Sequence, residues 1–375
     1  MFGRKKPVTQ NAVVAKHMNR FFNRLEKTEH STRAVAEAYV SHLFHQRSRR
    51  LVNEKKFARS PFHIGLGVHG GNFTQITKRA TLVSDTLLLS HNRVGERHRI
   101  KTIRDKVQAY DGMDFLDHPG EDATLWHTTA FLEVLCPDLD ALGRWIVDAE
   151  PLLRAGLVWY LPSYAVAEGF YATSPNVPRE VDEAKQAEFA VNQVPTVLDF
   201  LVHNGKAVAE SDAHPVKSSV VRPVLTVDLP FIDGVSLRDF GKITIDEFAA
   251  YANFRSFLRQ TFLDLDDAVH AVQSERKLVT VGQRIEDEIR GIEAQMAKVR
   301  RKRTVAVTGA GIGTVGATLV AVYGPAFAQA LAILGAAGAG GVWGIIQTAM
   351  DNSPRALRHD RWYYVWALAK RANRP

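Results

Sequence analysis

The chain has 375 residues, of which 46% are hydrophobic and 23% are charged, a composition that excludes a disordered protein. Its formal net charge is +8, and its single cysteine, Cys136, excludes an internal disulfide and indicates a reducing compartment. The first residues lack the apolar core that a secretory signal needs.

The excess of positive charge lies at the start of the chain. Residues 1–60 contain fourteen Lys or Arg and four Asp or Glu. The spacing of apolar residues predicts one helix over 8–27 and a second over 31–45. Such a basic helical segment can contact the phosphates of lipid or nucleic acid, or it can be only a solvated face. No RNA-recognition or zinc-finger motif accompanies it.

Residues 61–235 predict a mixed α+β unit. Pro61–Asn72 is rich in glycine and carries His63 and His69, but no carboxylate or cysteine completes a metal-ligand set, so we expect a surface connection. The remaining pattern predicts a set of helices, strands and turns. Strands are expected over 76–91, 93–104, 157–161 and 220–229, and helices over 138–148 and 181–203. We also expect a turn that ends at Gly156, and a turn or helix stop at Asn204-Gly205.

The unit contains none of the short motifs that mark common catalytic sites. We find no G-x-S-x-G, no G-x-x-x-x-G-K-[ST] and no H-E-x-x-H. The sequence therefore identifies no catalytic residue, no metal site and no cofactor, and it favours a non-enzymatic protein.

Residues 240–303 predict a helical stalk. Thr244-Ile-Asp-Glu247 has the spacing of a capping box, and apolar residues from Tyr251 onward follow at steps of three and four. That single apolar seam is typical of a helical bundle core or of an intermolecular coiled coil. The stalk leads directly into a basic cluster formed by Arg300, Arg301, Lys302 and Arg303.

Residues 304–350 form a run of 47 residues without a single Asp, Glu, Lys or Arg. Gly324-Pro325 divides the run into two halves, each long enough to cross a bilayer core of about 30 Å as a helix. The run therefore predicts an apolar helical hairpin that is either transmembrane or buried in the protein. A hairpin that is apolar enough to insert, yet not obligately inserted, suits a conditionally membrane-active protein. In composition it resembles the hydrophobic hairpin of pore-forming colicins.

Small residues and flanking residues favour the membrane interpretation. Small side chains four residues apart let helices approach closely in lipid, which predicts self-association. Basic and aromatic residues suit the headgroup layer. The candidate packing residues are Gly309, Gly313, Gly316, Ala336, Gly340 and Gly344. The candidate interface residues are Arg300, Arg301, Lys302 and Arg303, together with Trp362, Tyr363, Tyr364 and Trp366 in the basic, aromatic tail 351–375.

Gly311, Gly313 and Gly316 also match the dinucleotide-binding spacing G-x-G-x-x-G. That motif needs an acidic residue about twenty positions later and a doubly wound sheet. No Asp or Glu lies between Gly316 and Asp351, and too few residues follow Gly316 for such a sheet. We therefore do not interpret these glycines as a nucleotide site.

The sequence as a whole predicts an α+β protein that ends in a helical stalk and a two-helix apolar hairpin. We expect a membrane-associated, non-enzymatic protein with its soluble part and both hairpin ends on the cytoplasmic side. Its partners would be the lipid bilayer and further copies of the chain, as in a membrane-perturbing defence or toxin effector of a bacterium or phage. The alternative is a soluble binding protein that buries the hairpin as core and contacts nucleic acid through residues 1–60.

Overall fold

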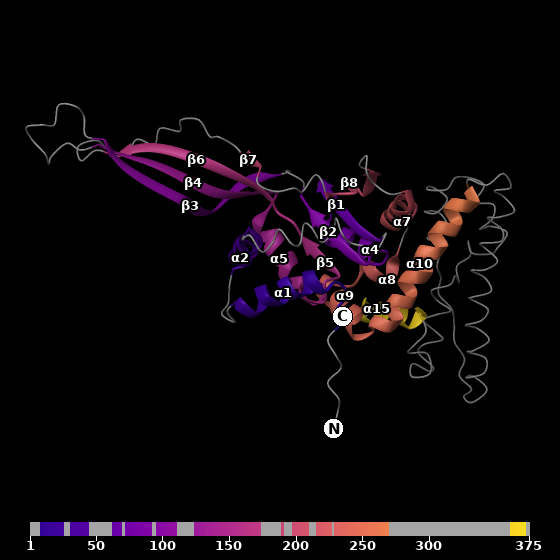
Figure 1. Ribbon diagram of the computed structural model, residues 1–375. Helices are drawn as coiled ribbons and strands as arrows, with labels where there is room; N and C mark the ends of the chain where they lie inside the picture. Colours follow the sequence, from indigo (N-terminus) through magenta and orange to yellow (C-terminus); the bar gives the residue numbers. More distant parts are fainter. Residues whose placement is uncertain are drawn as a thin grey trace, which may run out of the picture.

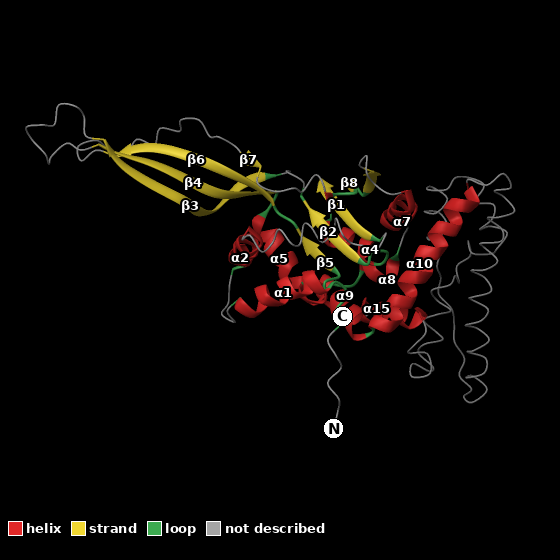
Figure 2. Ribbon diagram, viewed as in Figure 1, coloured by secondary structure: helices red, strands yellow, loops and turns green. Residues whose placement is uncertain are grey.

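The computed structural model describes residues 8–25, 31–44, 62–69, 72–91, 95–110, 124–173, 189–190, 197–209, 215–226, 229–269 and 361–372. These residues form two β-sheets with surrounding helices, the mixed α+β class that the sequence predicts (Figures 1 and 2). The predicted hairpin 304–350 and the stalk beyond residue 269 lie outside the described residues. In the described ranges, none of the helices combines the length and the apolar character needed to cross a bilayer.

The first sheet has five strands in the order β5-β2-β1-β8-β9. All are parallel to their neighbours except β9, which pairs antiparallel with β8. Strands β1 and β2 are buried along almost their entire length, as expected for parallel strands covered on both faces. The strands are β1 (His63–His69), β2 (Thr86–Ser90), β5 (Val158–Tyr160), β8 (Phe200–His203) and β9 (Lys206–Ala209).

Gly65 explains how β8 approaches the centre of this sheet. A Cβ atom at Gly65 would overlap the backbone carbonyl of Val197, so only glycine permits the approach. The Gly65 amide donates to the buried carboxylate of Asp199 at 2.6 Å, and the Lys217 ammonium lies 3.0 Å from the same carboxylate. Sequence positions 134 residues apart are thereby joined at the start of β8.

The second sheet is antiparallel and projects from the body of the molecule as a long arm (Figure 1). Its strand order is β3-β4-β6-β7, and β3 lies at an edge. Two irregularities in register, between Arg99 and Lys101 and between Thr102 and Arg104, bend the pairing of β3 with β4. The strands are β3 (Glu96–Tyr110), β4 (Thr124–Cys136), β6 (Ser163–Thr173) and β7 (Phe189–Ala190).

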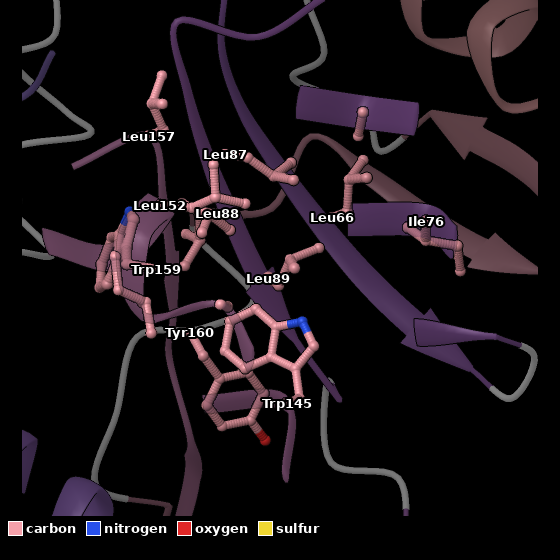
Figure 3. Close-up of a cluster of buried hydrophobic side chains, with 14 of the residues drawn as sticks. Leu66, Ile76, Leu87, Leu88, Leu89, Trp145, Leu152, Leu157, Trp159 and Tyr160 are labelled. Atoms are coloured by element: carbon pink, nitrogen blue, oxygen red, sulfur yellow. The ribbon is translucent and has the colours of Figure 1, made fainter. Parts of the chain in front are cut away.

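The helices pack with the five-stranded sheet around one hydrophobic core. Met18 of α1, Tyr39 of α2 and Phe254 of α10 belong to the same buried cluster as the strands. Figure 3 shows part of that cluster, with Trp145 and Tyr160 beside the leucines of β2. The helices are α1 (Ala12–Arg24), α2 (Thr32–Phe44), α4 (Phe73–Thr81), α5 (Leu139–Asp148), α6 (Glu150–Ala155), α7 (Pro215–Thr226), α8 (Pro230–Asp233), α9 (Leu237–Asp246), α10 (Phe248–Val269) and α15 (Arg361–Ala372).

Several local predictions are confirmed. Helices α1, α2 and α5 and strands β3 and β5 lie where the spacing predicts them, and Asn204-Gly205 is the turn between β8 and β9. The turn expected to end at Gly156 is the short helix α6, which does end at this residue, in the left-handed conformation with φ of 70°. The apolar residues at the start of the predicted stalk, including Tyr251 and Phe254, are buried in the core of this chain.

Four local predictions are wrong. Pro61–Asn72 is not a surface connection, because its centre is the buried strand β1. The first half of 76–91 is helix α4, which Asn72 caps. The predicted strand 220–229 is mostly helix α7, whose buried residues recur at helical spacing although many are β-branched. The predicted helix 181–203 ends in strand β8, and its short described piece at 189–190 is also a strand.

The predicted capping box at Thr244 is wrong as well. Thr244 lies inside α9, and its hydroxyl donates to the Phe240 carbonyl at 2.7 Å instead of capping a new helix. Ser236 is the residue that caps α9, because its hydroxyl accepts from the Asp239 amide.

Candidate functional site: a pocket at the carboxyl edge of the parallel sheet

A pocket of about 440 Å³ opens where β1 and β2 end. The strand order reverses beside β1, since β2 and β5 lie on one side of it and β8 on the other. In open α/β sheets, ligands bind at the carboxyl ends of the strands near such a reversal. The pocket is lined by Val68, Asn72, Phe73, Thr74, His91, Pro137, Asp138, Ala141, Leu142, Arg144, Trp145 and Asp148.

One wall of the pocket is aromatic. The Phe73 ring is stacked on the His91 ring, with centroids 4.7 Å apart and an interplanar angle of 21°. Trp145 meets Phe73 edge to face at 5.3 Å, and its indole N–H donates to the Thr77 hydroxyl at 3.0 Å. These contacts fix the rings before any ligand arrives, which lowers the entropy cost of binding a flat molecule.

His91 is a neutral hydrogen-bonding group in this wall. Burial lowers the pKa of its imidazole to about 4, so the ring is uncharged at pH 7. Its Nδ1 lies 2.9 Å from the hydroxyl of Tyr160. Burial also raises the pKa of Tyr160 well above its usual value, so this hydroxyl keeps its proton. With Nδ1 engaged by Tyr160, Nε2 is the ring nitrogen that a ligand in the pocket can use.

The polar rim combines positive and negative groups. Asn72 caps α4 by accepting from the Gln75 amide at 3.0 Å, which leaves the first amides of that helix at the pocket. Opposite them, Asp138 caps α5 and lies 4.0 Å from the exposed guanidinium of Arg144. The half-buried carboxylate of Asp148 makes no ion pair or hydrogen bond with another residue that the structure describes.

Cys136 lies behind this wall as a buried thiol. Its Sγ is 3.7 Å from His91 Nδ1 and donates to the Asp138 carbonyl at 3.3 Å. Burial raises the pKa of the thiol to about 11, whereas a reactive cysteine needs the thiolate. Among the described ranges, no three His, Cys, Asp or Glu side chains are grouped as metal ligands. The arrangement is suited to noncovalent binding of a ligand.

Helix α4 connects the pocket to helix α10. Its first residues line the pocket, and the carbonyl of its last residue, Thr81, accepts from the buried hydroxyl of Tyr251 at 2.7 Å. Just beyond α4, the Ser84 carbonyl accepts from Arg255 at 3.1 Å. The Arg259 side chain donates at 2.8 Å both to the Val83 carbonyl and to the Asp85 carboxylate.

This contact is mostly shielded from water. The side chains of Arg255 and Arg259 are 9% and 12% exposed, and both form ion pairs with Asp85, at 3.4 and 2.8 Å respectively. The Arg259 guanidinium also lies over the Phe62 ring, 3.9 Å from its centroid. Helix α10 is therefore anchored to the sheet through the segment that follows α4.

The site residues proposed from the sequence lie mainly outside the described part of the chain. This holds for Gly309, Gly313, Gly316, Ala336, Gly340 and Gly344, and for Arg300, Arg301, Lys302 and Arg303. The four aromatic residues of the tail lie on α15, where the side chains of Trp362 and Trp366 are not described and Tyr363 is half-buried. Tyr364 is fully buried, with its hydroxyl 2.8 Å from that of Thr244, so it packs in the core rather than at a surface.

Sequence reasoning missed every residue of the pocket. Two signals were present at its edge, namely the glycines that follow β1 and the helix cap at Asn72. A strand followed in the sequence by two glycines and a helix cap is the pattern of a first βα turn, which is where open α/β sheets bind ligands. The aromatic wall has no comparable signal, because Phe73, His91 and Trp145 come from separate segments.

No protein-family model, no curated protein and no solved structure matches the chain. Function is therefore inferred from the pocket, from α10 and from the apolar run.

Proposed function

We propose that the protein is a membrane-associated, non-enzymatic sensor. Its α/β body faces the cytoplasm and binds a small ligand in the pocket between α4 and α5. The signal passes through α4 and α10 to the apolar hairpin 304–350, which inserts in the bilayer and associates with other copies of the chain. In a bacterium or phage, such a protein would act as a membrane-perturbing defence or toxin effector.

The observation that carries this proposal is the double contact of α4. One end of this nine-residue helix lines the pocket, and the other end accepts the Tyr251 hydroxyl of α10. Between these ends, Thr77 accepts from the pocket residue Trp145. A ligand that shifts α4 changes a buried contact of α10, and α10 begins the segment that leads toward residue 304.

The membrane part of the proposal is supported by the sequence. Residues 304–350 carry no charge over a length sufficient for two crossings, and basic residues precede them. Gly309 and Gly313, like Gly340 and Gly344, are four residues apart, which suits close packing of helices in lipid.

Deletion of residues 304–350 tests the membrane attachment. We expect full-length protein in the membrane fraction of lysed cells and the deletion variant in the supernatant. An unchanged distribution would argue against an anchoring hairpin. Replacing Gly309 and Gly313 together with leucine should reduce the oligomer size in detergent, whereas an unchanged size would remove the packing argument.

A second candidate function rests on a basic stripe of α1. Lys16, Arg20 and Arg24 are exposed at four-residue intervals on one face of this helix, and none pairs with an acid in the described ranges. The opposite face is fixed in the core by residues such as Val14 and Met18, so the stripe points outward. Cations along one helix face suit the phosphate backbone of nucleic acid.

This alternative predicts duplex binding that weakens steeply with salt, because phosphate contacts release counterions. Replacing Lys16, Arg20 and Arg24 with glutamine should remove most of the binding. The matched control replaces Arg97 and Arg222, which are exposed on other elements. No binding of a labelled duplex at low salt would dispose of the alternative.

A further inference from the structure

We infer that the ligand of the pocket is a mononucleotide. Its base would lie against the aromatic wall of Phe73, His91 and Trp145, and its phosphate would lie at the N-terminus of α4. This inference rests on the proposed function, because it names the ligand class of the same pocket.

The phosphate position follows from the orientation of α4. The helix has nine residues, and its first turn lines the pocket through Asn72, Phe73 and Thr74. The Asn72 side chain satisfies the Gln75 amide, so the amides of Phe73 and Thr74 stay available to an anion. The Thr74 hydroxyl adds a donor at the same rim.

Arg144 supplies a cation within the same pocket. Its side chain is 64% exposed and lies 4.0 Å from Asp138, a separation at which the pair is weak. Because this pair costs little to break, the guanidinium can turn toward a bound phosphate and form two parallel hydrogen bonds.

An independent observation points to the base. His91 is only 9% exposed and lines the pocket, and both of its hydrogen-bonding contacts with described side chains, the Tyr160 hydroxyl at 2.9 Å and the Cys136 thiol at 3.7 Å, are made by Nδ1. Nε2 makes no hydrogen bond within the described residues and is not fully buried, so a polar atom of a ligand in the pocket can reach it. The heteroatoms of a base provide such an atom in the plane of a ring, while Phe73 and Trp145 offer apolar surface to the ring itself.

The carboxylate of Asp148 is placed to bind the sugar of a mononucleotide. Asp148 lines the pocket as a half-buried carboxylate without a described partner. Asp148 is the last residue of α5, and a carboxylate that lines a pocket can accept hydrogen bonds from ribose hydroxyls. The cavity of about 440 Å³ lies within the range of about 300–1,000 Å³ that is usual for small-molecule sites.

The test is calorimetric titration of the full-length protein in detergent. AMP, GMP, CMP and UMP are titrated separately, followed by the nucleoside of the tightest binder and by inorganic phosphate. We expect at least one mononucleotide to bind, and both its nucleoside and inorganic phosphate to bind about tenfold more weakly or not at all. Absence of binding by all four would overturn the inference, as would a nucleoside that binds as tightly as its monophosphate.

Two variants locate the site. Arg144→Glu should weaken the mononucleotide about tenfold or more and leave the nucleoside affected much less, because the residue is exposed and faces the phosphate. The matched control is Arg222→Glu, an equally reversed charge on the exposed face of α7. Equal effects of the two variants would overturn the placement.

The experiment separates this inference from the proposed function. Binding without membrane association would retain the ligand and reject the membrane sensor. Membrane association without binding of any of the four mononucleotides would retain the membrane attachment and reject the mononucleotide as the ligand.

Discussion

The contact between α4 and α10 is tested by removing one oxygen atom, in the variant Tyr251→Phe. The Tyr251 hydroxyl donates to the Thr81 carbonyl at 2.7 Å, and both residues are fully buried. The variant leaves this carbonyl of the last turn of α4 without that donor. Loss of a buried hydrogen bond with an unsatisfied partner costs about 1–3 kcal/mol.

That cost should appear locally as well as globally. We expect the midpoint of thermal unfolding to fall by a few degrees, since 1 kcal/mol corresponds to about 2–4 °C in domains of 150–250 residues. Amide exchange in α10 (Phe248–Val269) should accelerate about tenfold for each 1.4 kcal/mol lost from its anchoring. Mass spectrometry of exchanged peptides measures the amide exchange rate both in α10 and in the remainder of the fold.

Tyr39→Phe is the matched control. The Tyr39 hydroxyl is also fully buried and also bonds to backbone, donating to the Tyr160 carbonyl at 3.0 Å and accepting from the Tyr160 amide at 3.1 Å. It therefore ties α2 to the edge strand β5, away from the contact of α4 with α10. We expect a similar loss of stability with unchanged exchange in α10. If both variants affect α10 equally, the hydroxyl of Tyr251 does not anchor that helix, and the proposed route from the pocket fails.

Three further predictions concern the pocket and the core. In His91→Asn, the free energy of unfolding should fall less on acidification than it does in the wild type. The wild-type imidazole has a pKa of about 4 in the folded protein and 6.5 in the unfolded chain, so protonation favours unfolding. The wild type should therefore lose roughly 2 kcal/mol between pH 7 and pH 5 through this residue, as measured by urea unfolding. Gly143→Ala should destabilise by about 1–3 kcal/mol because its Cβ overlaps the Thr32 carbonyl. Gly241→Ala should be near neutral, because its Cβ meets only side-chain atoms of Leu152 and Pro151, at 3.3 Å or more; equal melting points of the two variants would refute this packing. Asp199→Ala removes the partner of Lys217, whose side chain is 11% exposed, and should cost about 3–5 kcal/mol; a loss below 1 kcal/mol would show that the pair is not shielded from water in solution.

Local patterns were sufficient for the elements whose burial is periodic. Helix α1 presents Val14, Met18 and Phe21 at helical spacing, and α5 begins directly after Asp138, a favourable cap residue. In both helices the signal lies within one turn or two, so no distant residue is needed to find it.

The missed elements depend on distant neighbours. Strand β1 contains Gly65, which indicates a loop in isolation, but the residue is required by the backbone of Val197, far along the chain. Helix α7 is rich in valine, whose β-branched side chain favours strands, and burial against other elements overrides that preference. Thr244 has the sequence context of a helix cap, but its hydroxyl is hydrogen-bonded to that of Tyr364, 120 residues later in the chain.

The pocket is a consequence of strand order, which the sequence did not provide. Its aromatic wall needs α4, the end of β2 and α5 to meet, because Phe73, His91 and Trp145 lie on these three separate segments. The local sequence pattern identifies the glycines before α4, but it does not identify the aromatic wall of the pocket.

Flotation of the purified full-length protein with anionic liposomes, followed by a carbonate wash, tests the membrane sensor most directly. The account predicts that the protein floats and resists the wash, and that a variant lacking 304–350 does neither. A full-length protein that stays monodisperse without detergent and remains at the bottom of the gradient would contradict the account. In that case the hairpin belongs to a soluble core, and the basic stripe of α1 becomes the first surface to test.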